Sequence, residues 1–186
     1  MAVIYQPAED SYLLAGALED YLKSLKNPNK KIKILDMGSG SGIQAETCKK
    51  LKFENILVAD ISPDVIEHLK KSGFKVVQTD LFSKINKKDK FDLVIFNPPY
   101  LPEDKDEPED SKLATTAGKE GNEIIIKFLK QAKNHLTKQG VILLLISSLS
   151  KPHSIKKQIK ALNYKSKLID NQKLFFEELY VYLLRI

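Results

Sequence analysis

The fold is decided by the stretch Ile32-Lys33-Ile34-Leu35-Asp36-Met37-Gly38-Ser39-Gly40-Ser41-Gly42. A short apolar strand ends in an acid and three alternating glycines, and residues 43–52 follow as a helix. Glycines permit a sharp turn and a close approach of ligand to backbone, and the helix N-terminus offers N–H groups without helical partners. The spacing acid-x-G-x-G-x-G differs from the dinucleotide pattern G-x-G-x-x-G, because Ile43 stands where the third glycine would be.

Strands and helices alternate on both sides of this turn. Further strands are predicted over residues 55–60, 75–80, 91–96, 141–146, 164–170 and 179–184, and further helices over residues 9–25, 63–72, 122–136 and 152–162. Ser62 is the expected N-cap of the helix that Pro63 begins and Gly73 ends. The wholly apolar run 141–146 is typical of a strand in the middle of a parallel sheet. This alternation predicts an α/β layered fold.

Composition limits the class of protein. The chain has 186 residues, 42% of them hydrophobic, which suits one domain over residues 1–186, with residues 1–30 as an N-terminal helical segment. The longest apolar run is far shorter than the roughly 18 residues of a membrane helix, and no secretory signal is recognisable. The single cysteine, Cys48, excludes an internal disulfide and suits a reducing compartment. We therefore expect a cytoplasmic protein with no membrane contact, and the dispersed histidines predict no metal site.

Charge is unevenly distributed along the chain. Residues 101–112 hold six acids and two bases, a charge of −4, which leaves +10 for the rest of a chain whose net charge is +6. Most of the positive charge is scattered lysine, and the one arginine is Arg185. A nucleic-acid-binding protein usually has its positive charge gathered in one patch. We therefore interpret the lysines as a solvated surface and expect no direct binding to nucleic acid.

Three acids follow three successive predicted strands. Asp36 lies where it could hold an ammonium group, and Asp60 could accept both hydroxyls of a ribose. Asp80 could accept from the exocyclic amine of adenine. Gly38 and Gly40 could let a bound amino acid and ribose lie close to the backbone. S-adenosylmethionine carries all these groups, whereas a pyrophosphate would be repelled. The alternative interpretation is that the acids are helix caps and turn formers in a generic Rossmann-like domain.

The fourth predicted strand leads directly into Asn97-Pro98-Pro99-Tyr100. The side-chain oxygen of Asn97 and the backbone carbonyl of Pro98 could each accept one N–H of a planar amide-type NH2 group. Two prolines hold these acceptors in place, and Tyr100 offers a flat face for the planar group. Such a site would methylate a weakly nucleophilic nitrogen mainly by positioning it, without a strong general base. The alternative is an ordinary turn that closes a strand.

These motifs resemble the class I S-adenosylmethionine-dependent methyltransferases, in the branch that methylates exocyclic or amide nitrogens. Asn-Pro-Pro-Tyr is shared by adenine-N6 DNA methyltransferases, some RNA guanine-N2 methyltransferases and HemK-type glutamine-N5 methyltransferases. Two segments narrow the choice: residues 5–14, YQPAEDSYLL, are similar to the N-terminal signature of the eukaryotic and archaeal release-factor enzymes, and residues 116–123, TAGKEGNE, to their Gly-rich segment. The resemblance spans about residues 5–186.

The resemblance implies a Rossmann-like fold with a seven-stranded, mostly parallel sheet and helices on both faces. The implied cofactor is S-adenosylmethionine, and the expected contacts to it are Ser11, Asp36, Gly38, Gly40, Asp60, Asp80, Leu81 and Asn97. The expected substrate contacts are Asn97, Pro98, Pro99 and Tyr100, of which Asn97, Pro98 and Tyr100 are the expected catalytic group. Asp36 replaces the commoner Glu, Ala117-Gly118 replaces two glycines, and no Trp precedes them.

The function expected from this resemblance is N5-methylation of the glutamine in the Gly-Gly-Gln loop of a class 1 translation release factor. The family further implies a small zinc-binding activator subunit as partner. One alternative is an adenine-N6 or guanine-N2 nucleic-acid methyltransferase. DNA enzymes normally add a recognition domain, however, and the acidic segment after Tyr100 would repel a phosphate backbone. Another alternative is a non-enzymatic scaffold, which would not need to keep Asp36, Asp60, Asp80 and Asn97.

Overall fold

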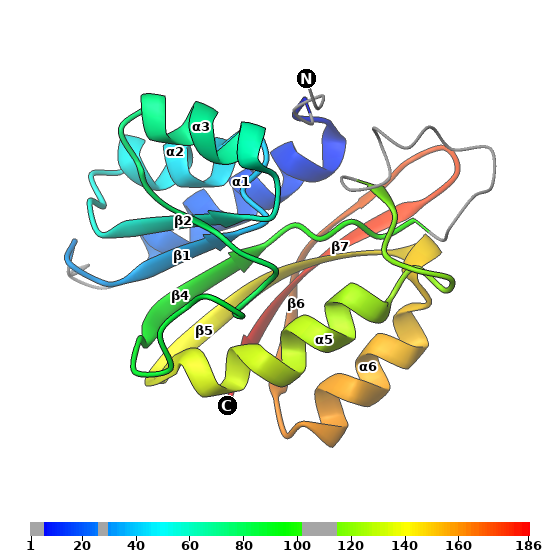
Figure 1. The fold of residues 1–186 in the computed structure, drawn as a ribbon. Coiled ribbons are helices and arrows are strands. Elements are labelled where there is room, and N and C mark those ends of the chain that lie inside the picture. The colour runs from blue at the N-terminus through cyan, green and yellow to red at the C-terminus, as the bar shows by residue number, and fades with distance from the viewer. Residues whose placement is uncertain (1–5, 26–29, 102–114) are drawn as a thin grey trace.

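The computed structural model describes residues 6–25, 30–101 and 115–186. These residues form one seven-stranded sheet in the order β3-β2-β1-β4-β5-β7-β6 (Figure 1). The strands are β1 (Ile34–Met37), β2 (Ile56–Asp60), β3 (Lys75–Gln78), β4 (Phe91–Phe96), β5 (Leu136–Ser147), β6 (Lys165–Lys173) and β7 (Glu178–Arg185). Strands β1 to β5 pair in parallel, and β7 lies antiparallel between β5 and β6. The expected seven-stranded, mostly parallel Rossmann-like sheet is confirmed.

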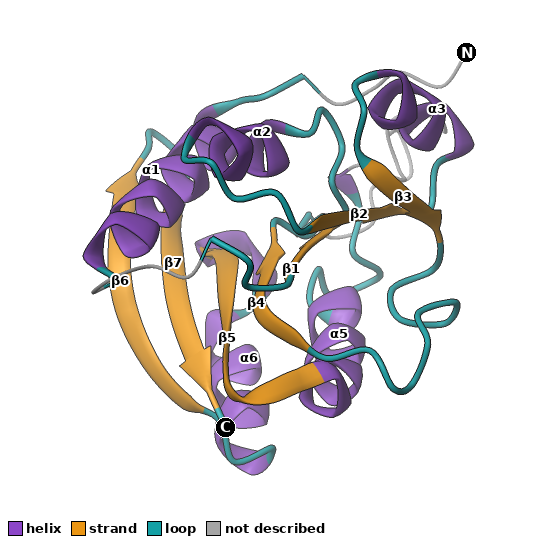
Figure 2. Cartoon of the chain, turned by 90° about the vertical axis from the view of Figure 1, so that its left-hand side faces the viewer, coloured by secondary structure: helices purple, strands orange, loops and turns teal. Residues whose placement is uncertain are grey.

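Five α-helices cover the sheet within the described ranges, and they are α1 (Glu9–Ser24), α2 (Ile43–Lys50), α3 (Pro63–Lys71), α5 (Glu123–Ala132) and α6 (Pro152–Ala161). Helices α1 to α3 pack on one face and α5 and α6 on the other, so the molecule has three layers (Figure 2). Strand β4 shows why: Leu93 and Ile95 join the core under α1 to α3, whereas Val94 and Phe96 join the core over α5 and α6. Alternate side chains of a central strand point to opposite faces, and both faces here are covered.

Local sequence signals account for both ends of α3. The Ser62 hydroxyl accepts a hydrogen bond from the Val65 N–H as the N-cap of α3, Pro63 is the first helical residue, and Gly73 adopts a φ of +82° after the helix. The helix expected over 122–136 ends at Ala132, and a 3-10 turn (Lys133–His135) follows it. Strand β3 ends at Gln78, so Asp80 lies two residues beyond the strand it was expected to end.

The interpretation of residues 141–146 as the middle of a parallel sheet is partly wrong. Strand β5 runs parallel to β4 on one side but antiparallel to β7 on the other, and it begins earlier, at Leu136. Burial on both faces gives the same apolar run whichever way the neighbour runs, because burial depends on what covers the sheet. Helix α6 and the β6–β7 hairpin return the chain so that β7 enters the sheet beside β5.

The sheet topology determines where ligands can bind. From β1 the chain proceeds outward through β2 to β3 and then returns to β4 on the other side of β1. Crevices form at such a reversal, beyond the carboxyl ends of the strands. Met37 at the end of β1 pairs with Ala59 of β2 and Phe96 of β4. The glycine turn, the end of β2 and the Asn97 segment therefore meet at one edge.

Some sequence features lie outside the described residues. These are Tyr5 of the N-terminal signature and residues 102–112 of the acidic segment. Among the residues that the structure describes, no helix combines the length and the apolar composition needed to span a bilayer.

Truncating the centre of the sheet should cost much stability. Leu143 is fully buried and lies between Ile95 of β4 and Leu183 of β7. Leu143→Ala should lower the free energy of unfolding by about 2–5 kcal/mol, since it removes buried methyl groups and leaves a cavity. Chemical denaturation measures this change. The matched control, Leu168→Ala on the edge strand, removes a side chain that is 43% exposed and should cost less than about 1 kcal/mol. Equal losses in the two variants would contradict the packing described.

Candidate active site

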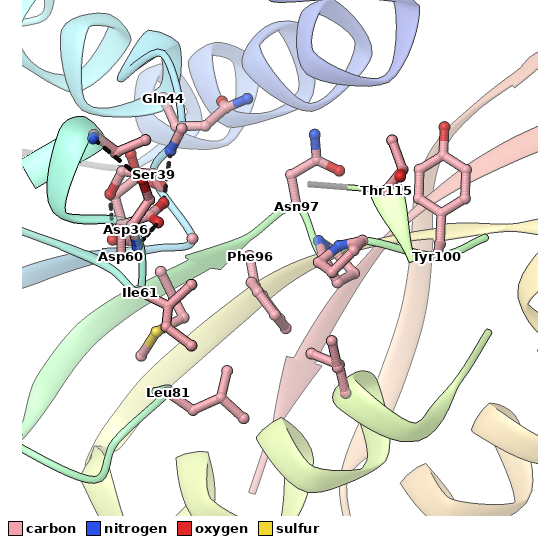
Figure 3. Close-up of a pocket in the computed structure, with 18 of the residues that line it drawn as sticks. Asp36, Ser39, Gln44, Asp60, Ile61, Leu81, Phe96, Asn97, Tyr100 and Thr115 are labelled. Atoms are coloured by element: carbon pink, nitrogen blue, oxygen red, sulfur yellow. Dashed lines mark hydrogen bonds between the residues drawn. The ribbon is translucent and has the colours of Figure 1, made fainter. Parts of the chain in front are cut away.

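A cavity of about 500 Å³ opens at the carboxyl edge of β1, β2 and β4. It brings together every site residue expected from the sequence, namely Ser11, Asp36, Gly38, Gly40, Asp60, Asp80, Leu81, Asn97, Pro98, Pro99 and Tyr100. Figure 3 shows Asp36, Asp60 and Ser39 gathered at one end, and Asn97, Thr115 and Tyr100 on the other side. The cavity therefore has a polar end for one ligand and a separate end, around Asn97, for another.

The glycine turn after β1 is held against the end of β2. The Ser39 hydroxyl donates to the carbonyl of Asp36 at 2.7 Å and accepts from the N–H of Ala59 at 3.2 Å. Gly38 has a φ of +61°, and a Cβ there would lie 3.3 Å from the Phe96 ring. A side chain at position 38 would thus be strained and would also crowd the floor of the cavity. The turn brings its backbone close to the ligand space at Gly38 and Gly40, where no side chain intervenes.

Asp60 is buried and oriented by backbone donors. Its Oδ1 accepts the N–H of Ser62 at 2.9 Å, and its Oδ2 accepts the N–H of Gly40 at 3.1 Å. Burial raises the pKa of Asp60, and these backbone donors oppose the rise. A carboxylate oxygen can accept more than one hydrogen bond. Asp60 is therefore fixed in position with acceptor capacity left for a diol such as that of a ribose.

Asp36 is almost inaccessible to water. Its Oδ2 accepts the N–H of Ala45 at 3.2 Å. Burial raises the pKa of Asp36 to about 7, the Ala45 N–H opposes this rise, and the negative charge of Asp60 adds to it. A carboxylate that is costly to ionise in the empty cavity gains most from a cation placed beside it. This residue suits an ammonium group, as the sequence predicts.

Beyond β3, Asp80 and Leu81 form another part of the wall. The Asp80 carboxylate is half-exposed and accepts from the Lys127 ammonium of α5 at 2.6 Å. Leu81 has a φ of +48°, a left-handed conformation that is unfavourable for a branched side chain. Such backbone strain is concentrated at functional sites. The adenine contact expected for Asp80 stays a prediction, and it would have to be made beside the bond to Lys127.

The Asn97 segment is braced on both sides. The Asn97 side-chain NH2 donates to Asp10 Oδ2 at 3.0 Å, while its Oδ1 is buried and has no hydrogen-bond partner among the residues that the structure describes. The N–H groups of Tyr100 and Leu101 both donate to the Thr115 carbonyl, at 3.1 and 2.8 Å. Buried acceptors are nearly always paired. The unpaired Oδ1 is therefore positioned for an N–H that a ligand brings.

The cavity-wall residues that sequence reasoning missed include Asp10, Gln44, Ile61 and Lys127. The Gln44 NH2 donates to the Ser11 carbonyl at 3.0 Å, and its Oε1 is a second buried acceptor that has no partner in the described part of the chain. Ile61 is 48% exposed in the cavity, which suits a flat apolar ring. The sequence did contain a signal for Ile61, because it is an apolar residue directly after the acid that ends a predicted strand. Gln44 and Lys127 gave none, because each resembles an ordinary polar residue of a helix.

Comparisons with known proteins agree with this geometry. The family model described as Eco57I restriction-modification methylase matches residues 15–178, which places the chain among those methylases. A protein from Methanocaldococcus jannaschii, named as a protein N5-glutamine methyltransferase, is 36% identical over 96% of this chain and 89% of its own length. The chain belongs to the protein N5-glutamine methyltransferases.

Two further similarities lie within this family. The Schizosaccharomyces pombe eRF1 methyltransferase catalytic subunit mtq2 is 30% identical over 82% of this chain and 76% of its own length. In the solved E. cuniculi Mtq2–Trm112 complex, which is described as responsible for methylation of the termination factor eRF1, the matching chain has a TM-score of 0.74 and 26% identity, with 97% of each chain covered. Protein N5-glutamine methyltransferases use S-adenosylmethionine, which supplies a methyl group on a positively charged sulfur.

The residues present fit this cofactor. Asp36 and the unpaired Gln44 Oε1 would hold an ammonium group, and Asp60 would accept ribose hydroxyls. Ile61 and Leu81 would contact the adenine ring. Four acids, Asp10, Asp36, Asp60 and Asp80, outnumber the one cation that the described residues place in the cavity wall, so the cavity favours a cationic ligand and disfavours a phosphorylated one.

The other end of the cavity is suited to an amide. Asn97 Oδ1 would accept one N–H and the Pro98 carbonyl the other, while Tyr100 covers the planar group. These acceptors are too weakly basic to remove a proton before the attack. They would orient the nitrogen lone pair and stabilise the positive charge that develops on it, and the methylated nitrogen would then lose one proton to solvent. Restricting the amide in this way can remove several kcal/mol of the barrier, about 7–11 at best.

Cofactor affinity should depend on pH through Asp36. Because the pKa of its carboxyl is about 7 in the empty site and an ammonium group needs the ionised form, lowering the pH from 7.5 to 6 should weaken S-adenosylmethionine binding roughly tenfold. Titration calorimetry in buffers of different ionisation enthalpy should also detect proton release near pH 7. In Asp36→Asn, binding should be weaker and this pH dependence lost. An unchanged pH profile in that variant would remove the assignment.

Removing the amide of Asn97 should separate catalysis from binding. Asn97→Ala should lower kcat by about 10²–10³-fold or more, because the substrate nitrogen loses its main acceptor. The dissociation constant for S-adenosylmethionine should change by less than about threefold, since the cofactor keeps its other contacts. Single-turnover kinetics and calorimetry provide the two numbers. Comparable losses in both would show that Asn97 acts mainly on the cofactor.

Proposed function

We propose that this protein transfers a methyl group from S-adenosylmethionine to N5 of the glutamine in the Gly-Gly-Gln loop of a class 1 translation release factor. The observation that carries the proposal is the buried, unpaired Asn97 Oδ1 beside the cavity's acidic end. Support for the substrate class comes from the S. pombe relative and the E. cuniculi structure, both described as acting on eRF1. We also propose that residues 1–186 act as one domain in the cytoplasm.

A glutamine loop suits the electrostatics of the cavity. Its wall includes four acids, Asp10, Asp36, Asp60 and Asp80, and among the described residues only one cation, Lys127, which is paired with Asp80. A neutral carboxamide on a narrow peptide loop can enter without bringing phosphates near these acids. This argument supports a protein substrate.

A nucleic-acid amino group is the second candidate, because a restriction-modification methylase model matches most of the chain. Adenine, guanine and glutamine all present a planar NH2 group, so the Asn97 site alone does not distinguish them. A flipped base would bring flanking phosphates near the four acids of the cavity, which is electrostatically unfavourable. The glutamine substrate is therefore preferred.

A small zinc-binding activator subunit completes the proposal. The E. cuniculi relative was solved in complex with Trm112, and its chain is matched over 97% of its length. We propose that the present chain forms a similar heterodimer. Activity should therefore be measured both alone and after co-expression with such a subunit.

The test is a methyl-transfer assay with purified components. The protein, alone or with its activator, should add one methyl group to the glutamine of the release-factor loop, as mass spectrometry of the loop peptide shows. A release factor with Gln→Asn in the loop, and enzyme with Asn97→Ala, should remain unmodified. Labelled S-adenosylmethionine offered with RNA or DNA should transfer nothing. Labelling of nucleic acid with an unmodified release factor would contradict the proposal.

A further inference from the structure

Asp10 joins the N-terminal helix to the catalytic amide. It lies in the first turn of α1 and is only 4% exposed. Its Oδ2 accepts the Asn97 NH2 at 3.0 Å, across 87 residues of sequence. Its Oδ1 accepts the backbone N–H of Ser11 at 2.6 Å and the Ser11 hydroxyl at 3.2 Å. The two carboxylate oxygens thus serve two different neighbours.

The orientation of an asparagine side-chain amide decides whether it offers an acceptor or a donor to a neighbour. Rotating the group by half a turn exchanges a carbonyl oxygen, which accepts, for an NH2, which donates, with almost no change in shape. In Asn97 only one orientation presents an acceptor to the cavity. The other would present NH2 to the NH2 of an incoming amide, and two donors cannot pair.

We propose that Asp10 is a positioning residue that selects the productive orientation of Asn97. A carboxylate beside the Asn97 NH2 favours the orientation in which that NH2 donates, so the amide oxygen is the atom left for a ligand: it is buried and has no hydrogen-bond partner among the described residues. The proposal rests on the proposed function only in needing an NH2 group as substrate.

Asp10 is itself held in place by its helix. Leu14 and Leu18 of α1 are fully buried against the sheet, and the Gln44 NH2 of α2 donates to the Ser11 carbonyl at 3.0 Å. The Asp10 carboxylate is therefore held in a fixed position relative to the end of β4. A loosely attached acid could not select one orientation of a neighbour.

The sharpest test is Asp10→Asn. The Ser11 N–H at 2.6 Å requires an acceptor, so the oxygen of the new amide should face Ser11 and its NH2 should face Asn97. Asn97 should then rotate and present NH2 to the cavity. We expect kcat to fall on the order of 10²-fold, with the dissociation constant for S-adenosylmethionine changed less than about threefold. The matched control is Glu9→Gln on the exposed neighbouring position, which should leave both unchanged.

Exchanging the residues at positions 10 and 97 distinguishes a positioning role of Asp10 from a purely structural one. In Asp10→Asn/Asn97→Asp, the amide at position 10 can donate to the carboxylate at position 97, which again presents an acceptor to the cavity. We expect this double variant to recover about tenfold or more of the kcat lost in Asp10→Asn. A second readout is the side-chain NH2 signal of Asn97 in ¹⁵N NMR spectra, assigned by its loss in Asn97→Asp, which should shift in Asp10→Asn without substrate.

The outcomes are distinguishable. Near wild-type kcat in Asp10→Asn, an equal loss of cofactor affinity, or a double variant no more active than Asp10→Asn would each overturn the proposal. If Asp10→Asn does not fold, the double variant is judged alone: kcat within about 30-fold of wild type supports positioning, and a larger loss contradicts it. The proposed substrate is tested separately by wild-type enzyme, because all variant values are ratios to wild-type activity on the same substrate.

Discussion

Burying negative charge at the carboxyl edge of the sheet is the constraint on which the site depends. Asp36 and Asp60 lie at the ends of neighbouring strands, with little water to stabilise them. Backbone N–H groups of Ala45, Gly40 and Ser62 compensate this burial in part. The glycine turn takes part in this compensation through Gly40, whose N–H reaches the Asp60 carboxylate. The negative charge that these donors leave uncompensated favours a cationic ligand. The geometry that stabilises the turn therefore also selects the cofactor.

Because the strand order reverses between β1 and β4, the segment that follows β4 lies beside the acidic end of the cavity. Asn97 leaves β4 beside the glycine turn because Phe96 pairs with Met37. One strand end therefore offers charge for a methyl donor, and the next offers a neutral acceptor for a planar NH2 group. A weak nucleophile needs orientation more than proton removal, and the braced turn between Asn97 and Leu101 provides it. The division between an end for the cationic methyl donor and an end for the planar NH2 group follows from topology and from two short motifs.

Much of the site could be predicted because its residues follow strands. Asp36, Asp60 and Asn97 each come directly after or at the end of an apolar run, and parallel strands bring their carboxyl ends to one edge. Asp10 and Lys127 could not be identified this way, because their roles arise from contacts across 87 and 47 residues of sequence. The direction of β7 was also beyond the sequence pattern, since Leu143 is buried equally beside a parallel or an antiparallel neighbour. Periodicity reports burial, whereas pairing direction and side-chain partners depend on the assembled fold.

The most direct test of the account is a crystal structure of the protein with S-adenosylhomocysteine and a glutamine-containing loop peptide. The account predicts the amino-acid part of the ligand at Asp36, its ribose hydroxyls on Asp60, and the glutamine NH2 donating to Asn97 Oδ1 near the sulfur atom. A ligand bound away from the ends of β1 and β2, or an Asn97 oxygen turned away from the peptide amide, would contradict it.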